Sequence, residues 1–218
     1  MIISPERRLI FVHIPKTGGT SLALALEGRA KADDILIGDT PKARRRKGRV
    51  PAQAEAARGR LWKHSTLADI EGLVTRDFIA QSFCVTLVRN PWDRLVSLFH
   101  WVRMQKFDHP MVSRAQSMDF AAFLCAPETQ AALRAQPYGH YLTDSEGQPQ
   151  PVHCIRLEHV EADAAPLWAH LGFRLTLPHV NGSGRDTPYQ SHYDRPLADL
   201  VGDICAEDIS RFGYAFDG

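Results

Sequence analysis

Two short apolar runs, each followed at once by a turn and a helical pattern, constrain the fold of this chain more than any other feature. Residues 9–14 (LIFVHI) are followed by a turn at residues 15–19 and by helix-forming residues from Thr20 onward. Residues 83–88 (FCVTLV) are followed by Arg89 and then by NPWDRLVSLFHW. Short β-branched runs of this kind are typical of strands that a parallel sheet buries on both faces. The alternation predicts an α/β protein with a mostly parallel central sheet flanked by helices.

The second of these helices has clear signals at its start. Asn90 is expected to cap it, and Pro91 suits its first position. Its buried face is expected to contain Leu95, Leu98, Phe99 and Val102, which follow the i, i+3, i+4, i+7 spacing. Arg94, Ser97 and Trp101 fall on another side of the helix.

The rest of the chain gives weaker signals. We expect strands at residues 61–64 and 151–157, a helix from a Thr66–Asp69 capping pair to residue 74, and helices at 120–134, 163–171 and 196–211. Residues 38–60 are expected to form a long surface loop with a short helix at 52–58, and residues 178–193 a second loop. A chain of 218 residues without internal repeats fits a single domain spanning residues 1–218.

The first of these loops is strongly basic. Lys42, Arg44, Arg45, Arg46, Lys47 and Arg49 place six positive charges within eight residues. Three interpretations stay open: a solvated loop, a cover that attracts an anionic acceptor, and a nucleic-acid contact. The net charge of the chain is only +1, so no nucleic-acid partner is expected from its overall field.

The cysteines and the apolar runs bear on the compartment. None of the four cysteines forms a C-x-x-C pair, and Cys84 and Cys154 lie inside expected strands, so buried free thiols and a reducing compartment are expected. No apolar run approaches the roughly 20 residues needed to span a membrane. The first 16 residues are interrupted by charge and proline too early for a signal peptide. Together these features predict a cytoplasmic protein.

The turn after the first strand has the components of an anion site. A helix N-terminus carries a partial positive charge and presents backbone N–H groups. Glycines let an anion approach the backbone, hydroxyls donate hydrogen bonds, and a lysine adds a full charge. The residues concerned are Lys16, Thr17, Gly18, Gly19, Thr20 and Ser21.

The end of the second strand decides between kinds of nucleotide site. A nucleoside triphosphatase or kinase places its lysine after the glycines and needs a carboxylate to hold Mg²⁺. Here Lys16 precedes the glycines, and the strand is followed by Arg89. An arginine repels a metal ion and attracts a second anion, and Ser97, two helical turns later, is its natural partner. The ligand is therefore expected to carry two anionic groups.

Taken together, these residues resemble the sulfotransferase family that uses 3′-phosphoadenosine 5′-phosphosulfate (PAPS). Residues 14–21 (IPKTGGTS) resemble its 5′-phosphosulfate loop, and residues 86–101 (TLVRNPWDRLVSLFHW) resemble its 3′-phosphate motif. A weaker likeness follows in the expected order at residues 63–66, 136–147, 155–163, 178–185 and 208–216. The chain is most similar to the carbohydrate-type branch found in Golgi enzymes and in bacteria, which implies a P-loop-like fold.

The resemblance implies a role for each matching residue. Lys16 would contact the bridging oxygen of PAPS, and residues 17–21 would hold the 5′-phosphate. Arg89 and Ser97 would hold the 3′-phosphate. His64 would be the general base, and Arg185 would close over the nucleotide. The implied reaction moves a sulfuryl group from PAPS to a hydroxyl, expected to be that of a glycan, and leaves the product PAP without help from a metal.

Two other functions stay open at this point. One is a P-loop-like kinase or nucleoside triphosphatase, against which Arg89 argues because a metal-binding aspartate is expected there. The other is a catalytically inactive PAP-binding module. The presence of both Lys16 and His64 argues against it.

Overall fold

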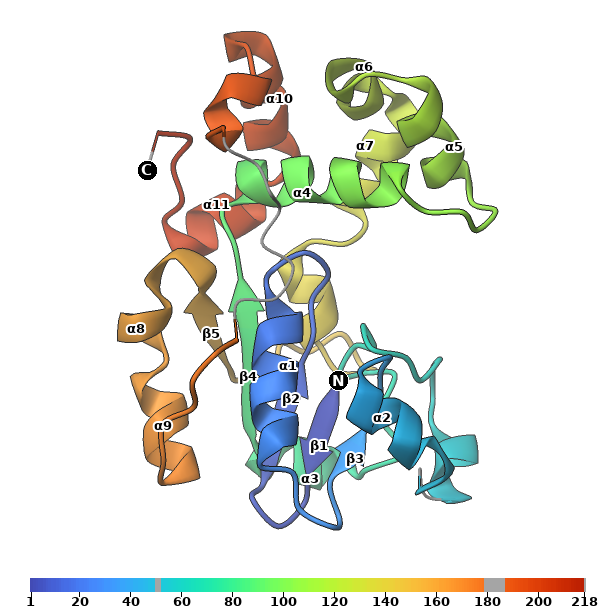
Figure 1. Ribbon diagram of the computed structural model, residues 1–218, viewed down its shortest axis with the longest axis vertical. Helices are drawn as coiled ribbons and strands as arrows, with labels where there is room; N and C mark the ends of the chain where they lie inside the picture. Colours follow the sequence, from blue (N-terminus) through green and yellow to red (C-terminus); the bar gives the residue numbers. More distant parts are fainter. Residues whose placement is uncertain (50–51, 179–186, 218) are drawn as a thin grey trace. The chain divides into compact units, whose positions relative to one another are not determined.

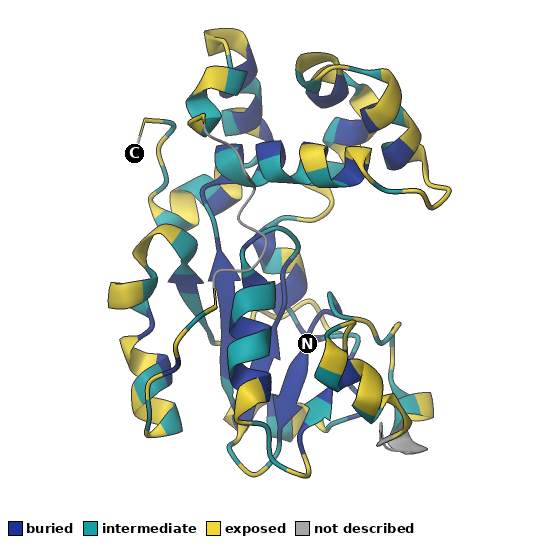
Figure 2. Cartoon of the chain, in the orientation of Figure 1, coloured by how far each residue is buried: buried dark blue, intermediate teal, exposed yellow. Residues whose placement is uncertain are grey.

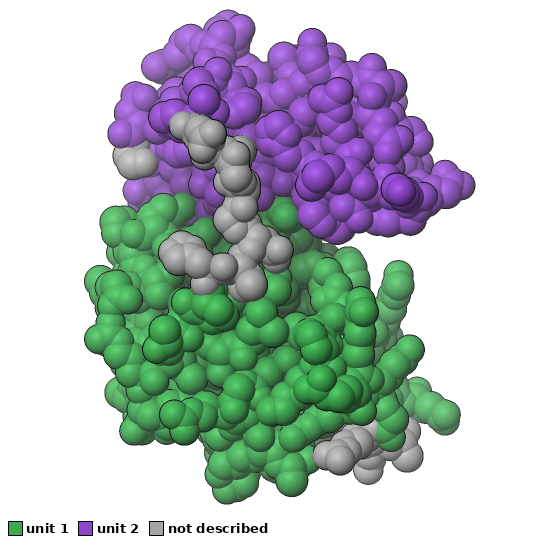
Figure 3. Space-filling model, in the orientation of Figure 1, with its two compact units in different colours: residues 1–88, 138–181 green, residues 89–137, 182–218 purple. Residues whose placement is uncertain are grey.

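The computed structural model describes residues 1–49, 52–178 and 187–217, which form two compact units (Figure 3). Unit 1 comprises Met1–Val88 and Tyr138–Asn181, and unit 2 comprises Arg89–Pro137 and Gly182–Gly218. The chain first passes from unit 1 to unit 2 where the expected second strand ends. The expectation of a single domain over residues 1–218 stays a prediction.

Unit 1 contains a five-stranded sheet (Figure 1). Its strands are β1 (Ile2–Ser4), β2 (Leu9–Val12), β3 (Ile35–Leu36), β4 (Phe83–Val88) and β5 (Val152–Arg156), in the order β3-β1-β2-β4-β5. The three longer strands, β2, β4 and β5, are parallel, whereas β1 is antiparallel to β2 and β3. The predicted mostly parallel sheet is therefore confirmed, and the two short antiparallel strands are additions to it.

Two of the parallel strands, β2 and β4, are buried as their sequences predict (Figure 2). All four residues of β2 and five of the six in β4 are buried, which explains their continuous apolar composition. Phe11 pairs with Val85 in the β2–β4 register, and both face one apolar cluster. Helix α1 (Gly19–Gly28) contributes Leu22 and Leu26 to this cluster, and α9 (Ala165–Leu171) contributes Leu167. The sheet is thus fixed to the helix that follows the glycine-rich turn.

Residues 41–49 are helical, so the prediction of a loop is wrong there, whereas the short helix expected at 52–58 is present in part as a 3-10 turn. The segment 38–60 contains α2 (Pro41–Arg46) and 3-10 turns at Lys47–Arg49 and Ala52–Ala56. The Thr40 side chain caps α2 by accepting from the Ala43 N–H (3.2 Å), and it donates to the buried carboxylate of Glu27 (2.6 Å). Lys42 and Arg46 donate to backbone carbonyls of residues 27 and 31. These contacts with a distant part of the chain hold the basic segment in a helix.

The segment 61–74 forms turns, so the predicted strand at 61–64 and the predicted helix from Thr66 are both wrong. The capping pair itself does form, because Thr66 and Asp69 exchange hydrogen bonds of 2.7 and 3.1 Å. The Leu67 N–H, however, donates to the carbonyl of Tyr141, 74 residues later. Gly72 has φ +91°, and a Cβ there would lie 1.9 Å from the Ala56 oxygen. Tertiary contacts thus replace the expected helix.

Two short helices complete the part of unit 1 that the structure describes. They are α3 (Arg76–Gln81), which precedes β4, and α8 (Val160–Asp163), which precedes α9. The helix expected at 163–171 is therefore present as α9, with α8 before it. Cys84 and Cys154 are free thiols, the first buried and the second half-buried.

Unit 2 is helical in its described part. Its helices are α4 (Pro91–Arg103), α5 (Pro110–Ser117), α6 (Phe120–Cys125), α7 (Pro127–Arg134), α10 (Arg195–Ile204) and α11 (Ala206–Phe212). As predicted, the Asn90 side chain caps α4, and Leu95, Phe99 and Val102 are buried, although Leu98 is only half-buried. The helices expected at 120–134 and 196–211 are each interrupted, before Pro127 and at Cys205. No helix among the described residues is long and apolar enough to cross a membrane.

Replacing Thr40 by valine is expected to lower the free energy of unfolding by about 1–2 kcal/mol, because the cap of α2 and the hydroxyl donor to a buried carboxylate are both lost. Thr40→Ser keeps both hydrogen bonds and serves as the control. Urea denaturation at pH 7 measures the difference. Equal stability of the valine and serine variants would contradict a structural role for this contact.

Candidate functional site

The loop between β2 and α1 contains the first group of predicted site residues. Lys16 and Gly18 have positive φ angles, +66° and +83°, and the first is a conformation that few non-glycine residues adopt. The Thr17 side chain is fully buried, and its hydroxyl donates to the Ile14 carbonyl (3.0 Å). That hydroxyl therefore stabilises the turn. Among the polar side chains of the loop, those of Lys16, Thr20 and Ser21 are partly exposed.

The two glycines are required by packing within unit 1. A Cβ on Gly18 would lie 2.7 Å from a methyl carbon of Leu157. A Cβ on Gly19 would lie 2.3 Å from the imidazole ring of His13. These positions face protein atoms, so the absence of a side chain lets Leu157 and His13 approach the turn. The sequence argument that the glycines clear space for an anion missed this contribution.

The N-terminus of α1 has no side-chain cap. Gly18 occupies the cap position without a side-chain hydrogen bond, and the first turn contains no acidic residue. In contrast, side chains cap α2 and α4. The partial positive charge of a ten-residue helix is therefore not balanced by a side chain of its own first turn. Together with the Lys16 ammonium, this arrangement is suited to an anionic group.

His64 lies against the same part of unit 1. Its Nδ1 is 2.7 Å from the backbone carbonyl oxygen of His13, the residue whose ring contacts Gly19. A carbonyl oxygen only accepts hydrogen bonds, so we assign the proton of the neutral ring to Nδ1. Nε2 then keeps its lone pair. A neutral imidazole in this tautomer can accept a proton at Nε2.

The surroundings of His64 keep it neutral. Burial lowers the pKa of His64 from 6.5 to about 4, and the hydrogen bond to the His13 carbonyl opposes the shift only in part. The charge of Lys63 lowers the pKa of His64 further. Burial also lowers the pKa of His13 well below its ordinary value. Both imidazoles are therefore uncharged at pH 7.

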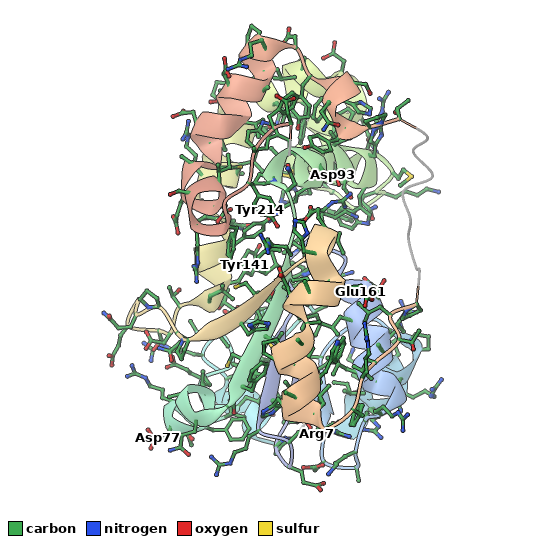
Figure 4. The ribbon with its side chains drawn as sticks, turned by 90° about the vertical axis from the view of Figure 1, so that its left-hand side faces the viewer. Arg7, Asp77, Asp93, Tyr141, Glu161 and Tyr214 are labelled. Atoms are coloured by element: carbon green, nitrogen blue, oxygen red, sulfur yellow. The ribbon has the colours of Figure 1, made fainter. Side chains whose placement is uncertain are left out.

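The second group of predicted site residues lies in unit 2, at the start of α4. Arg89 forms an ion pair with Asp93, one turn into the helix: Nε and Nη2 lie 2.7 and 2.5 Å from Oδ2 (Figure 4, where Asp93 is labelled). Ser97 is half-buried on α4. The i, i+4 spacing of Arg89 and Asp93 is visible in the sequence, but our sequence argument did not use it.

Asn90 and Trp92 have structural roles within unit 2. The Asn90 amide donates to the Tyr189 hydroxyl (3.1 Å) and to the Ala215 carbonyl (2.9 Å). The Trp92 indole N–H donates to the Ala198 carbonyl (2.9 Å), and the Trp92 carbonyl accepts from the Tyr193 hydroxyl (2.8 Å). This part of the motif thus connects α4 to the C-terminal segment.

The structure brings some predicted residues together within each unit. In unit 1 the loop 16–21 and His64 are linked through His13. In unit 2 Arg89 lies just before α4 and Ser97 lies within that helix. Arg185 lies outside the described residues. Over residues 1–49, 52–178 and 187–217, no group of three or more histidine, cysteine, aspartate or glutamate side chains could hold a metal ion.

Gly19→Ala is expected to destabilise the protein by about 1–3 kcal/mol, because the new methyl group overlaps the His13 ring. The displaced His13 should also alter the hydrogen bond to His64, which ¹⁵N NMR of the imidazole nitrogens detects. Gly28→Ala is the matched control at the other end of α1, because a Cβ there meets nothing within 4 Å. Unchanged imidazole signals and stability in Gly19→Ala would contradict the described packing.

Comparison with known proteins places the chain in a family. No curated protein and no solved structure gives a significant match. The model of the sulfotransferase family matches residues 1–165 of the 218, a region that contains the glycine-rich loop, His64, Arg89 and Ser97. The chain therefore belongs to the sulfotransferase family.

Proposed function

We propose that this protein is a PAPS-dependent O-sulfotransferase whose acceptor is a carbohydrate hydroxyl. In the proposed reaction the acceptor oxygen forms a bond to the sulfur of PAPS. The bond between that sulfur and the oxygen of the 5′-phosphate breaks, so PAP leaves with the electron pair of this bond. The acceptor hydroxyl loses its proton to Nε2 of His64. The products are a sulfate ester, PAP and a protonated imidazole, which releases its proton to water.

The orientation of His64 is the observation that carries the proposal. A general base needs a neutral ring with a lone pair, within hydrogen-bond reach of the hydroxyl whose proton it accepts. The hydrogen bond from Nδ1 to the His13 carbonyl supports this assignment, and the packing of the His13 ring on Gly19 links the base to the loop.

A pKa of about 4 limits what His64 can do. Such a base is too weak to deprotonate a free sugar hydroxyl in advance. It accepts the proton as the oxygen–sulfur bond forms, because the hydroxyl becomes strongly acidic at that point. Proton transfer and sulfuryl transfer are therefore proposed to occur together.

The other predicted residues act on the anionic groups in this proposal. Lys16 stabilises the charge that develops on the departing oxygen, and the hydroxyls of Thr20 and Ser21 with the N-terminus of α1 hold the 5′-phosphate. Arg89 and Ser97 hold the 3′-phosphate, for which Arg89 contributes charge while it remains paired with Asp93. Arg185 is proposed to cover the nucleotide.

Transfer of ³⁵S from labelled PAPS to a panel of neutral glycans, acidic glycans, phenols and amines tests the function. We expect labelled glycan products, and His64→Ala should lower the turnover rate by about 10²–10⁴-fold with PAP affinity nearly unchanged. His159→Ala changes an exposed histidine of the same unit and is the control. If His64→Ala keeps the turnover rate of the wild type, His64 is not the general base. Mg²⁺-dependent hydrolysis of ATP, without sulfuryl transfer, would favour a nucleoside triphosphatase.

The low pKa of His64 predicts the pH dependence. The ring is neutral above pH 4, so turnover at saturating substrates should be nearly the same at pH 5 as at pH 7. With the ordinary histidine pKa of about 6.5, turnover at pH 5 would instead be about 25-fold lower than at pH 7. A loss of turnover as the pH falls through 6.5 would contradict the low pKa of His64.

The same low pKa predicts how the free energy of unfolding depends on pH. Below pH 6.5 the unfolded chain binds a proton at His64, whereas the folded ring binds it only near pH 4. The free energy of unfolding should therefore fall as the pH is lowered from 6.5 to 4, and by less in His64→Gln.

A further inference from the structure

An exposed indole lies beside the proposed base. Within the described part of unit 1, Trp62 is the large hydrophobic side chain that remains exposed, with 42% of its surface accessible. Its ring centre is 4.9 Å from that of His64, and the two ring planes are nearly perpendicular, at 88°. An exposed tryptophan retains apolar area that a ligand can cover.

The backbone that carries Trp62 is held in one conformation. The fully buried Ser65 hydroxyl accepts from the Trp62 N–H (2.9 Å) and lies 2.9 Å from the carbonyls of Arg60 and Trp62. Next in the chain, Lys63 forms an ion pair with Asp39 (2.7 Å). The indole is therefore presented from a preorganised turn, which lowers the entropy that a ligand would lose on ordering it.

A guanidinium group lies against the same indole. The Cζ atom of Arg60 is 5.5 Å from the centre of the Trp62 ring, a cation–π distance. Among the described residues, no carboxylate forms an ion pair with Arg60, which is exposed. The turn thus combines an apolar ring surface, a cation and a base within five residues.

Trp62 lies next to His64, where the proposed reaction requires the acceptor to bind. The acceptor hydroxyl must come within hydrogen-bond distance of His64, so the ring that bears it lies within about one ring width of the indole. The adenine of PAPS, in contrast, is separated from the reacting sulfur by the ribose and the 5′-phosphate. An aromatic residue next to the base is therefore placed for the acceptor and not for the adenine.

We infer that Trp62 is the stacking surface for the acceptor sugar, and that Arg60 binds a carboxylate on the same glycan. This inference rests on the proposed function of His64. The apolar C–H face of a pyranose ring covers the indole, while its hydroxyl points to the base. Arg60 adds selectivity for a ring that carries an anionic substituent over a neutral one.

Steady-state kinetics with two glycans tests the inference: unsulfated chondroitin, which carries a carboxylate in every second sugar, and neutral chitopentaose. Trp62→Ala should raise KM for both glycans about tenfold and leave the KM for PAPS within about twofold, whereas Trp62→Phe should restore most of the affinity. Arg60→Gln should raise KM for chondroitin alone. Phe107→Ala, which removes an exposed aromatic side chain of unit 2, should change neither constant.

Binding without turnover separates this inference from the proposed function. Calorimetric titration of PAP-loaded His64→Ala protein with chondroitin oligosaccharides should show weaker binding when Trp62→Ala is added. If the wild type transfers no sulfuryl group but this loss occurs, the proposed function fails and the stacking surface stands. Three outcomes overturn the inference: no binding of either glycan, a rise in the KM for PAPS, or a fall in kcat with a shifted pH profile at unchanged KM.

Discussion

The hydrogen bond between the His64 ring and the His13 carbonyl connects two parts of unit 1 that the proposed reaction needs close together, the base and the glycine-rich loop. His13 directly follows β2, so its position is fixed by a strand that pairs with both β1 and β4. Its carbonyl orients the proposed base, and its ring contacts Gly19 at the start of α1. One residue at the end of a central strand therefore positions both the proposed base and the glycine-rich loop.

The elements with strong local signals were predicted correctly from the sequence. β2 and β4 have continuous apolar runs, and α4 has both a capping asparagine and a proline at its first position. β5 was also predicted, although its run contains His153 and Arg156. β1 and β3 have only three and two residues, too few for a periodic pattern. α2 was missed because its charged composition concealed the Thr40–Pro41 start signal. Its stabilising contacts also come from α1 and the residues after it, which no local pattern reveals.

The sequence indicated which residues make up much of the candidate site, but not which atoms each of them contacts. The family resemblance is confirmed over residues 1–165, which include the main motifs. Residue type alone could not show that the Thr17 hydroxyl donates to a carbonyl within the turn. Nor could it show that the missing side chain of Gly18 leaves room for Leu157. The sequence also could not predict the low pKa of His64. Burial of the ring is its main cause, and that burial depends on residues far away in the sequence. Arg89 has an acidic partner, Asp93, in the first turn of the helix that follows it, and the spacing of four residues is visible in the sequence.

The contact between Gly19 and the His13 ring has a consequence for how this site can evolve. A methyl group at position 19 and an imidazole at position 13 cannot occupy the same space, since the separation would be 2.3 Å. Sequences that diverge from this one should therefore change the two positions as a pair: a larger residue in the loop requires a smaller one at the strand end. The hydrogen bond to the His64 ring comes from the backbone carbonyl of residue 13, which a smaller side chain at this position would keep. Position 13 can therefore change first, and only then can position 19 accept a side chain.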